Sequence, residues 1–180
     1  SVIAERMNQL AEGLLSIARG DHAPARQTVE RVDFISLVRG VTTEMQPLFE
    51  DKDLHLDVNL PSKGVSIHAE ADGLRRIVAI LLYNALKYSH TGGTVALTVE
   101  EDSQGLTMEV SDTGTGIPPE SLNRIFDRFY RVDASRDRKS GGYGLGLAIA
   151  QQIAREHQGH IVASSVVGRG SSFRLTLPAS

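Results

Sequence analysis

The sequence predicts a two-layer α/β protein, in which one mixed, mostly antiparallel sheet of about five strands is covered on one face by about three helices. Three observations lead to this class. Segments with helical periodicity alternate with segments of strand periodicity along the 180 residues. Several strand segments follow one another directly, which favours antiparallel neighbours over a doubly wound parallel sheet. Apolar residues make up 41% of the chain, enough to form a buried core.

Composition excludes several classes of function. The formal net charge of −3 argues against a protein that binds nucleic acid through a basic surface. The chain has no cysteine, so a disulfide framework and thiolate chemistry are excluded. Its six histidines are scattered without the spacing of a metal site. No apolar run approaches the roughly 18 residues that cross a bilayer.

The first 27 residues are expected to be separate from the main domain. Residues 1–20 carry apolar side chains at heptad spacing: Ile3, Met7, Leu10, Leu14 and Ile17. Either this N-terminal helix packs on its own domain, or it pairs with a helix outside the chain, and the second interpretation is slightly favoured. Residues 21–27 read as a linker, and residues 28–180 as the main domain. The helical pattern is already under way at Ser1, so we expect a piece of a longer protein.

The first half of the main domain shows a strand, a helix and two further strands. Residues 28–32 have a short strand pattern, and Asp33 is expected to cap the helix that follows. One face of that helix carries its apolar residues: Phe34, Leu37, Val38, Val41, Met45 and Leu48. Alternation of apolar and polar residues predicts a half-buried strand over residues 54–60, and residues 65–69 form another.

The second half adds two helices and four strands. Residues 71–89 have the pattern of a strongly apolar helix, and a glycine turn at residues 91–93 leads into a hairpin. Two sets of alternating residues are expected to face inward in this hairpin: Val95, Leu97 and Val99, and opposite them Leu106, Met108 and Val110. Another helix is expected over residues 144–157, followed by strands over residues 161–166 and 171–177.

Polar side chains near the end of the helix at residues 71–89 are candidates for a binding site. Asn84 and Lys87 stand three residues apart, so they share one helix face, and Tyr88 is adjacent to that face. An amide oxygen can bind Mg²⁺, and an ammonium can neutralise phosphate. The alternative is a solvated last turn in which Lys87 interacts favourably with the helix dipole. When this helix is considered without the rest of the chain, the solvated turn is the favoured interpretation.

Two glycine-rich turns bracket the centre of the chain, at residues 112–118 and 141–146. Glycines let backbone N–H groups approach an anion, and the start of a helix adds positive charge. Asp112 can accept a hydrogen bond from an exocyclic amine such as that of adenine, beside which Gly114 and Gly116 permit a flat base to approach. Alternatively, Asp112 is a turn residue whose side chain hydrogen-bonds its own backbone. When Asp112 is considered without the other motifs, this second interpretation is favoured. The two turns together predict a nucleotide site with a movable cover.

Residues 123–140, between these turns, combine basic and aromatic side chains. They hold six basic and three acidic residues in a chain whose net charge is −3, so a basic stretch accompanies an acidic remainder. This distribution suits the capture of a polyanion. Three aromatic residues gather here, and we expect them to hold the stretch onto the body: Phe126, Phe129 and Tyr130. A merely solvated loop gives no reason for that clustering.

Four stretches of the chain resemble, in order and spacing, the N, G1, F and G2 boxes of sensor histidine kinases of two-component systems: residues 84–88, 112–117, 126–131 and 142–149. The resemblance extends over about residues 29–177. Residues 1–20 also look like the end of the second helix of that family's dimerization domain. The resemblance to sensor histidine kinases implies the Bergerat (GHKL) fold, with an ATP lid at about residues 118–143.

The resemblance also implies an activity, partners and a location. The chain would bind Mg·ATP and transfer the γ-phosphoryl group to a histidine of the dimerization domain, for relay to an aspartate of a response regulator. The implied partners are its own dimerization domain, the response regulator and a second subunit, with no nucleic acid. The implied location is the cytoplasmic portion of a receptor in the inner or plasma membrane.

Roles carry over to the helix and to the first glycine turn residue by residue. Asn84 would bind Mg²⁺ through its side-chain oxygen, Lys87 would contact phosphate, and Tyr88 would lie against the base or sugar. Asp112 would bind the adenine amino group. Three residues of the same turn would shape the base pocket: Gly114, Gly116 and Ile117.

The lid and the second turn complete the implied site. Arg131, with Arg138 and Lys139 as alternatives, would reach the γ-phosphate. Phe126 and Phe129 would hold the lid, beside Tyr130. The second turn and the helix start would wrap the phosphates: Gly142, Gly144, Leu145, Gly146 and Leu147.

Two departures from the family pattern keep other functions open. Ile80 stands where an additional Asn is usual, which removes one polar contact to the metal or its water shell. No histidine of the chain is followed by Glu or Asp, so we expect the acceptor histidine to lie outside it.

A hydrolytic ATPase of the gyrase or mismatch-repair type has Glu at the Ile80 position to activate water. A non-catalytic nucleotide-binding module that regulates a partner is the third hypothesis, and Ile80 favours it.

Overall fold

The structure is a computed structural model that describes residues 28–132 and 146–179. The predicted helix at residues 1–20 and the linker at residues 21–27 lie outside this description, as does the second part of the expected lid.

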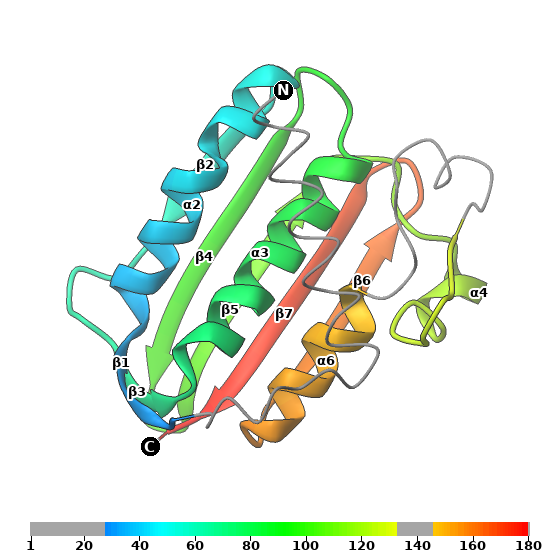
Figure 1. Cartoon of the computed structure of the whole chain (residues 1–180). Coiled ribbons are helices and arrows are strands. Elements are labelled where there is room, and N and C mark those ends of the chain that lie inside the picture. Colours follow the sequence, from blue (N-terminus) through cyan, green and yellow to red (C-terminus); the bar gives the residue numbers. More distant parts are fainter. Residues whose placement is uncertain (1–27, 133–145, 180) are drawn as a thin grey trace.

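The centre of the molecule is a five-stranded mixed sheet. In spatial order its strands are β2 (His55–Asn59), β4 (Thr94–Asp102), β5 (Gly105–Asp112), β7 (Gly170–Pro178) and β6 (His160–Val166) (Figure 1). β2 and β4 run parallel, and every other pair in the sheet is antiparallel. The predicted mixed, mostly antiparallel sheet of about five strands is confirmed.

Two of the expected strands form a separate small sheet. β1 (Glu30–Asp33) and β3 (Ser66–Ala69) pair only with each other, in antiparallel register, which the sequence analysis does not foresee. Both strands have four residues, and each directs apolar side chains, Val32 and Ile67, into the common core. The backbone N–H of Phe34 donates to Val65 O at 2.8 Å, so this sheet also fixes the start of the first helix.

Three helices cover one face of the central sheet: α2 (Phe34–Asp51), α3 (Ala71–Tyr88) and α6 (Gly146–Glu156) (Figure 1). Asp33 caps α2 as predicted, because its carboxylate accepts hydrogen bonds from Ser36 N at 3.2 Å and Ser36 Oγ at 2.9 Å. The apolar stripe predicted for α2 and the inward-facing residues predicted for the hairpin are all buried. The core therefore lies between the helical layer and the sheet.

Two helices end in the same hydrogen-bonding pattern. After α2, Leu54 N donates to Phe49 O at 2.8 Å around Asp53, whose φ is 55°. After α6, Gly159 N donates to Ala154 O at 2.8 Å around Gln158, whose φ is 58°. Both are Schellman motifs, in which the left-handed position usually holds glycine.

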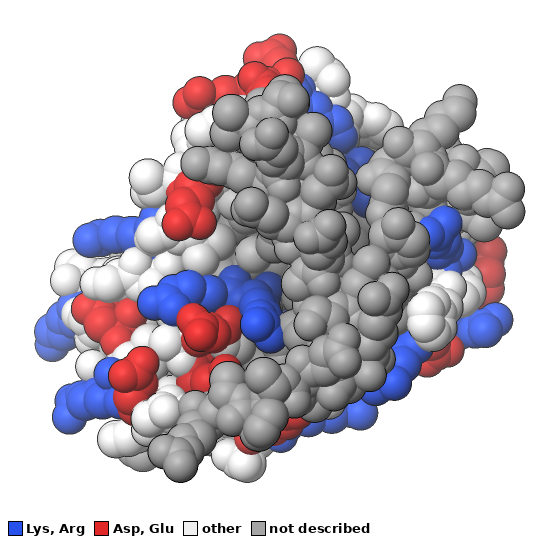
Figure 2. Space-filling view, in the orientation of Figure 1, with Lys and Arg blue, Asp and Glu red and all other residues white. Residues whose placement is uncertain are grey.

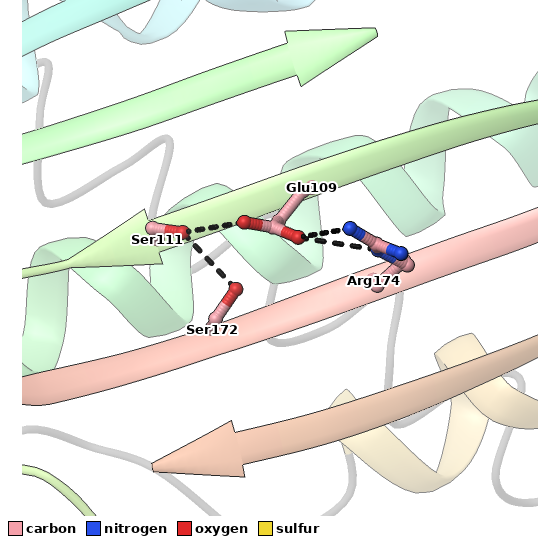
Figure 3. Close-up of polar contacts among 4 residues, drawn as sticks. All are labelled: Glu109, Ser111, Ser172 and Arg174. Carbon is pink, nitrogen blue, oxygen red and sulfur yellow. Dashed lines mark hydrogen bonds and ion pairs between the residues drawn. The ribbon is translucent and has the colours of Figure 1, made fainter. Parts of the chain in front are cut away.

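The other face of the sheet carries a polar network (Figure 3). Arg174 donates to the Glu109 carboxylate through Nε at 3.2 Å and Nη2 at 3.0 Å. Ser111 Oγ donates to the same carboxylate at 3.1 Å and lies 3.0 Å from Ser172 Oγ. The strands alternate between apolar and polar residues, in agreement with a sheet that the described helices cover on one face.

Charged side chains of both signs are interspersed over the described part of the helix-covered face (Figure 2). This part of the surface shows no extended field of one sign. Within residues 28–132 and 146–179, no helix has the length and apolar character that a membrane span requires.

Candidate functional site

The last two turns of α3 carry the first group of candidate residues. Asn84, Lys87 and Tyr88 are half-buried there, on a helix whose opposite side is packed in the core. The Nζ atom of Lys87 lies 5.2 Å from the centroid of the Tyr88 ring. The ammonium is thus positioned by a cation–π contact at this end of the helix.

Asp112, at the end of β5, is 6% exposed and has a defined set of donors. Its Oδ1 accepts hydrogen bonds from Gly114 N at 2.9 Å and Ser171 N at 3.4 Å, and its Oδ2 accepts one from Ser171 Oγ at 3.0 Å. A carboxylate offers about four acceptor positions, so one remains for a ligand donor. The turn interpretation of Asp112 and the binding interpretation are therefore compatible.

The glycines after Asp112 are required by contacts within the protein. A Cβ on Gly114 would lie 2.2 Å from Tyr88 O, and one on Gly116, whose φ is 75°, would lie 2.5 Å from Val166 O. The sequence predicts that these glycines permit a flat base to approach. In the structure, their side-chain positions are occupied by the backbone of α3 and of the turn after β6.

The loop of residues 112–117 is hydrogen-bonded on both sides. On one side, Thr115 N donates to Tyr88 O at 3.4 Å, which ties the loop to the end of α3. On the other side, Ile117 N donates to Ser165 Oγ at 2.6 Å, and Gly168 N donates to Thr115 O at 2.9 Å. The loop that follows Asp112 and the end of α3 are therefore held next to each other, so their residues are candidates for one site.

The start of α6 lies against the same part of α3. A Cβ on Gly146 would be 3.5 Å from Ile80 Cγ2, and Ile80 is 5% exposed, one helical turn before Asn84. Leu147 packs against the hydrophobic core. The remaining predicted residues of this turn, Gly142, Gly144 and Leu145, lie outside the described residues.

The described part of the expected lid is held to the body by two aromatic residues. α4 (Pro119–Leu122) opens it, and the Phe126 ring packs edge-on against Phe173, with centroids 6.4 Å apart. Tyr130 OH lies 2.8 Å from Ser121 Oγ, and the guanidinium of Arg124 lies 4.7 Å from the Tyr130 ring centroid. The Phe126–Phe173 contact agrees with the predicted packing of aromatic residues onto the body. Tyr130 also packs against the core, while its polar contacts lie within the lid segment.

The predicted packing of Phe129 is wrong. Its side chain is 70% exposed, and the residue adopts a left-handed backbone conformation with a φ of 66°. Arg131, two residues later, is half-buried, and its role toward a phosphate stays a prediction. Arg138 and Lys139 lie outside the described residues.

Two serines that hydrogen-bond to the candidate residues were not predicted from the sequence. Ser171 fixes the Asp112 carboxylate, and Ser165 fixes the backbone of Ile117 while donating to Gly170 O at 2.9 Å. Ser171 had a detectable signal. It occupies the inward-facing register of β7 with Phe173 and other buried apolar residues, where a polar side chain needs a partner.

The donor set for a metal ion is small. Among the described residues, no group of three His, Cys, Asp or Glu side chains could hold a metal ion. An amide oxygen such as that of Asn84, together with oxygens of a bound ligand and water, is a ligand set that suits Mg²⁺ with a nucleotide.

Comparisons with known proteins identify the family of the chain. Residues 69–180 match the family described as histidine kinase-, DNA gyrase B-, and HSP90-like ATPase. The chain is 36% identical over 179 residues to the sensor histidine kinase WalK of Bacillus subtilis (strain 168), covering 97% of this chain and 29% of that protein. It is 39% identical over 175 residues to the sensor histidine kinase MtrB of Mycolicibacterium paratuberculosis, covering 97% and 31%.

Solved structures show the same fold. Full-length ShkA, solved in complex with AMPPNP, superposes with a TM-score of 0.77 at 28% identity, over 96% of this chain and 36% of that one. The chain thus spans about a third of the length of these relatives. Because the family match covers more than half of the residues, the chain belongs to the family of histidine kinase-, DNA gyrase B- and HSP90-like ATPases.

Proposed function

We propose that this chain is the catalytic ATP-binding part of a two-component sensor histidine kinase. One observation carries the proposal. The loop after Asp112 is hydrogen-bonded through Thr115 to the last carbonyl of α3, so a buried carboxylate and the Asn84–Lys87 face belong to one rigid end of the fold. The similarity of the chain to relatives that are named sensor histidine kinases supports the same function.

Each residue of the site has a defined task in this proposal. The free acceptor position of Asp112 receives the exocyclic amine of adenine, while Ser171 keeps the carboxylate oriented. The Asn84 oxygen binds Mg²⁺, and the Lys87 ammonium neutralises phosphate charge. Bound Mg·ATP supplies the phosphoryl group, and the protein supplies position and charge neutralisation, as phosphoryl transfer requires.

The remaining parts of the proposal concern the complete protein. The acceptor is a histidine of the dimerization domain, the protein acts as a homodimer, and a response regulator receives the phosphoryl group on an aspartate. A similar structure supports nucleotide binding, since full-length ShkA was solved in complex with AMPPNP. The chain would form the cytoplasmic portion of a membrane receptor. Arg131 and the glycines at residues 142, 144 and 146 would contact the phosphates.

A non-catalytic regulatory module is the second candidate. Ile80 favours it, because this buried side chain packs toward Gly146 and offers no polar atom on the turn that precedes Asn84. Such a module would bind nucleotide without transferring phosphate. A hydrolytic ATPase is disfavoured by the same residue, since Ile80 cannot activate water.

Phosphate transfer separates these functions. The chain is mixed with radiolabelled Mg·ATP and a separately prepared dimerization domain that contains the acceptor histidine. Acid-labile phosphate on that domain is the expected result. Nucleotide binding without transfer would favour the regulatory module, and phosphate released to water in the absence of acceptor would favour the ATPase.

The metal role of Asn84 is tested by nucleotide binding with and without Mg²⁺. Asn84→Ala should remove most of the Mg²⁺-dependent part of the affinity. Asn59→Ala serves as the matched control, because Asn59 is exposed on the edge strand β2. Equal Mg²⁺ dependence in wild type and Asn84→Ala would refute the assigned role.

A further inference from the structure

Lys52 connects the end of α2 to the end of α3. It is the C-terminal capping residue of α2, and its Nζ donates hydrogen bonds to Leu86 O at 2.5 Å and Lys87 O at 3.3 Å. These carbonyls belong to the last turn of α3, where the helix provides no N–H partners of its own. A side chain from another helix, 34 residues earlier in the sequence, therefore completes the end of α3.

We propose that Lys52 is a positioning residue for the nucleotide site. It fixes the last turn of α3, and through that turn it sets the Lys87 ammonium and the Tyr88 ring in place. The inference rests on the proposed function, since it concerns how well these two side chains meet a nucleotide.

The backbone that carries Lys52 is itself rigid. Asp53, the next residue, closes the Schellman motif of α2, and its carbonyl accepts a hydrogen bond from Gly92 N at 2.8 Å. His55 N donates to Gly93 O at 3.0 Å. The turn after α2 and the turn after α3 are thus hydrogen-bonded to each other, so Lys52 starts from a fixed point relative to the carbonyls that it contacts.

The other carbonyls at the end of α3 have their own partners. Ser89 donates to Ala85 O through N at 3.0 Å and Oγ at 2.6 Å, and Thr115 N donates to Tyr88 O. Lys52 therefore supplies the donors for the two carbonyls between them, those of Leu86 and Lys87. Removing its ammonium would leave the carbonyls of the turn that holds Lys87 without these donors, in a half-buried place where water replaces them poorly.

Charge supports the same role. The ammonium of Lys52 lies at the C-terminal end of α3, where a helix favours a cation. Burial lowers the pKa of Lys52, which reflects its partial removal from water at this contact. Its hydrogen bonds are directed to helix carbonyls, so it acts on the site through α3, while Lys87 lies on the face of the site itself.

Affinity for an ATP analogue tests the proposal. Binding of AMP-PNP with Mg²⁺ is measured by calorimetry, well below the unfolding temperature, for the whole chain and its variants. Lys52→Met, which keeps the apolar stem, should weaken binding about tenfold. Lys52→Arg, which can donate to the same carbonyls, should restore most of the affinity. Lys63→Met is the matched control, because Lys63 is exposed in the loop before β3.

A spectroscopic measurement separates positioning from simple stabilisation. In the free protein, the Cε protons of Lys87 should show an upfield NMR shift from the Tyr88 ring, because Lys87 Nζ lies 5.2 Å from its centroid. Lys52→Met should lose this shift while its circular dichroism stays that of a folded protein. Should Lys52→Met not fold, Lys52→Gln, whose amide is neutral and too short to reach both carbonyls, takes its place.

The outcomes are distinct. A wild-type chain that fails to bind AMP-PNP would overturn the proposed function, independently of Lys52. Wild-type binding with equal affinity in Lys52→Met, or an unchanged Lys87 shift, would overturn the role of Lys52 alone, even if the unfolding temperature falls. An equal loss in Lys63→Met would also contradict it.

Discussion

Ser171 and Ser172 are adjacent residues of β7 with opposite surroundings. Ser171 points inward and donates to Asp112 Oδ2 at 3.0 Å, whereas Ser172 lies on the open face near Ser111. Ser171→Ala should weaken ATP binding several-fold and lower the free energy of unfolding by about 1 kcal/mol, because the carboxylate loses a donor. Calorimetry and urea denaturation measure both effects.

Ser172→Ala is the natural comparison for Ser171→Ala. Its hydroxyl contacts only the polar network of the open face among the described residues, so nucleotide affinity should stay at the wild-type value. Equal affinity losses in the two variants would show that Asp112 does not depend on Ser171.

Asp33 makes the stability of the fold depend on acidity. Hydrogen bonds from Ser36 lower the pKa of its carboxyl below the usual 3.8, so the charged form stabilises the folded state above that value. This contribution is lost as the pH falls through the lowered pKa. Asp33→Asn keeps an oxygen for the cap but cannot ionise. Its unfolding temperature should be below that of wild type at pH 7, and the difference should shrink toward pH 3; a difference independent of pH would contradict this account.

At the level of single elements, the ends of α2 and α6 contain avoidable strain. Asp53 and Gln158 adopt left-handed backbone conformations, which cost a non-glycine residue about 1–2 kcal/mol of folding free energy. This cost exceeds the destabilisation that glycine causes by raising the conformational entropy of the unfolded chain. Asp53→Gly and Gln158→Gly should each raise the free energy of unfolding by about 0.5 kcal/mol. Thermal and denaturant unfolding provide the measurement.

The control for these glycines is an exposed position inside a helix. Arg39→Gly in α2 should lower the free energy of unfolding by about 1 kcal/mol, because its backbone is already helical. If Asp53→Gly or Gln158→Gly destabilised the protein as much, the Schellman geometry would not be the deciding factor.

The lid segment should depend on one phenylalanine and not on the other. Phe126 packs edge-on against Phe173, so Phe126→Ala should lower the free energy of unfolding by about 2 kcal/mol and speed amide exchange around α4. Phe129 is 70% exposed, so Phe129→Ala should change the free energy of unfolding by less than about 0.5 kcal/mol. Hydrogen exchange and denaturant unfolding of both variants decide the matter, and a reversed order of effects would contradict the packing described for the lid.

For the whole molecule, nucleotide binding should act as a stabiliser. A ligand at a hundred times its dissociation constant adds about 2.7 kcal/mol to the free energy of unfolding. Mg·ATP should therefore raise the unfolding temperature, and Mg·GTP should raise it much less, because a carbonyl replaces the amine that the Asp112 carboxylate would accept. Calorimetric scans with each nucleotide test this, and equal shifts would argue against Asp112 as the base-reading residue.

The sequence predicts the order of the elements because each helix and strand has a local periodicity. It also predicts Asp33 as a cap and the inward faces of the hairpin, which depend on residues a few positions apart. The separate β1–β3 pair, the Ser171 contact and the Lys52 contact were not predicted, since each joins segments distant along the chain. Phe129 was misjudged because apolar character alone does not determine whether a side chain is buried, and this one is 70% exposed.

The order of strands in the central sheet has a consequence for biosynthesis. β6 leaves the ribosome before β7, yet in the sheet it pairs only with β7, which lies between β5 and β6. Until β7 is synthesised, β6 has no neighbouring strand and Asp112 has no Ser171. The nascent chain therefore cannot complete the hydrogen bonds of the Asp112 carboxylate during translation of the first six strands. In the proposed function, ligand capture would follow the insertion of the last strand.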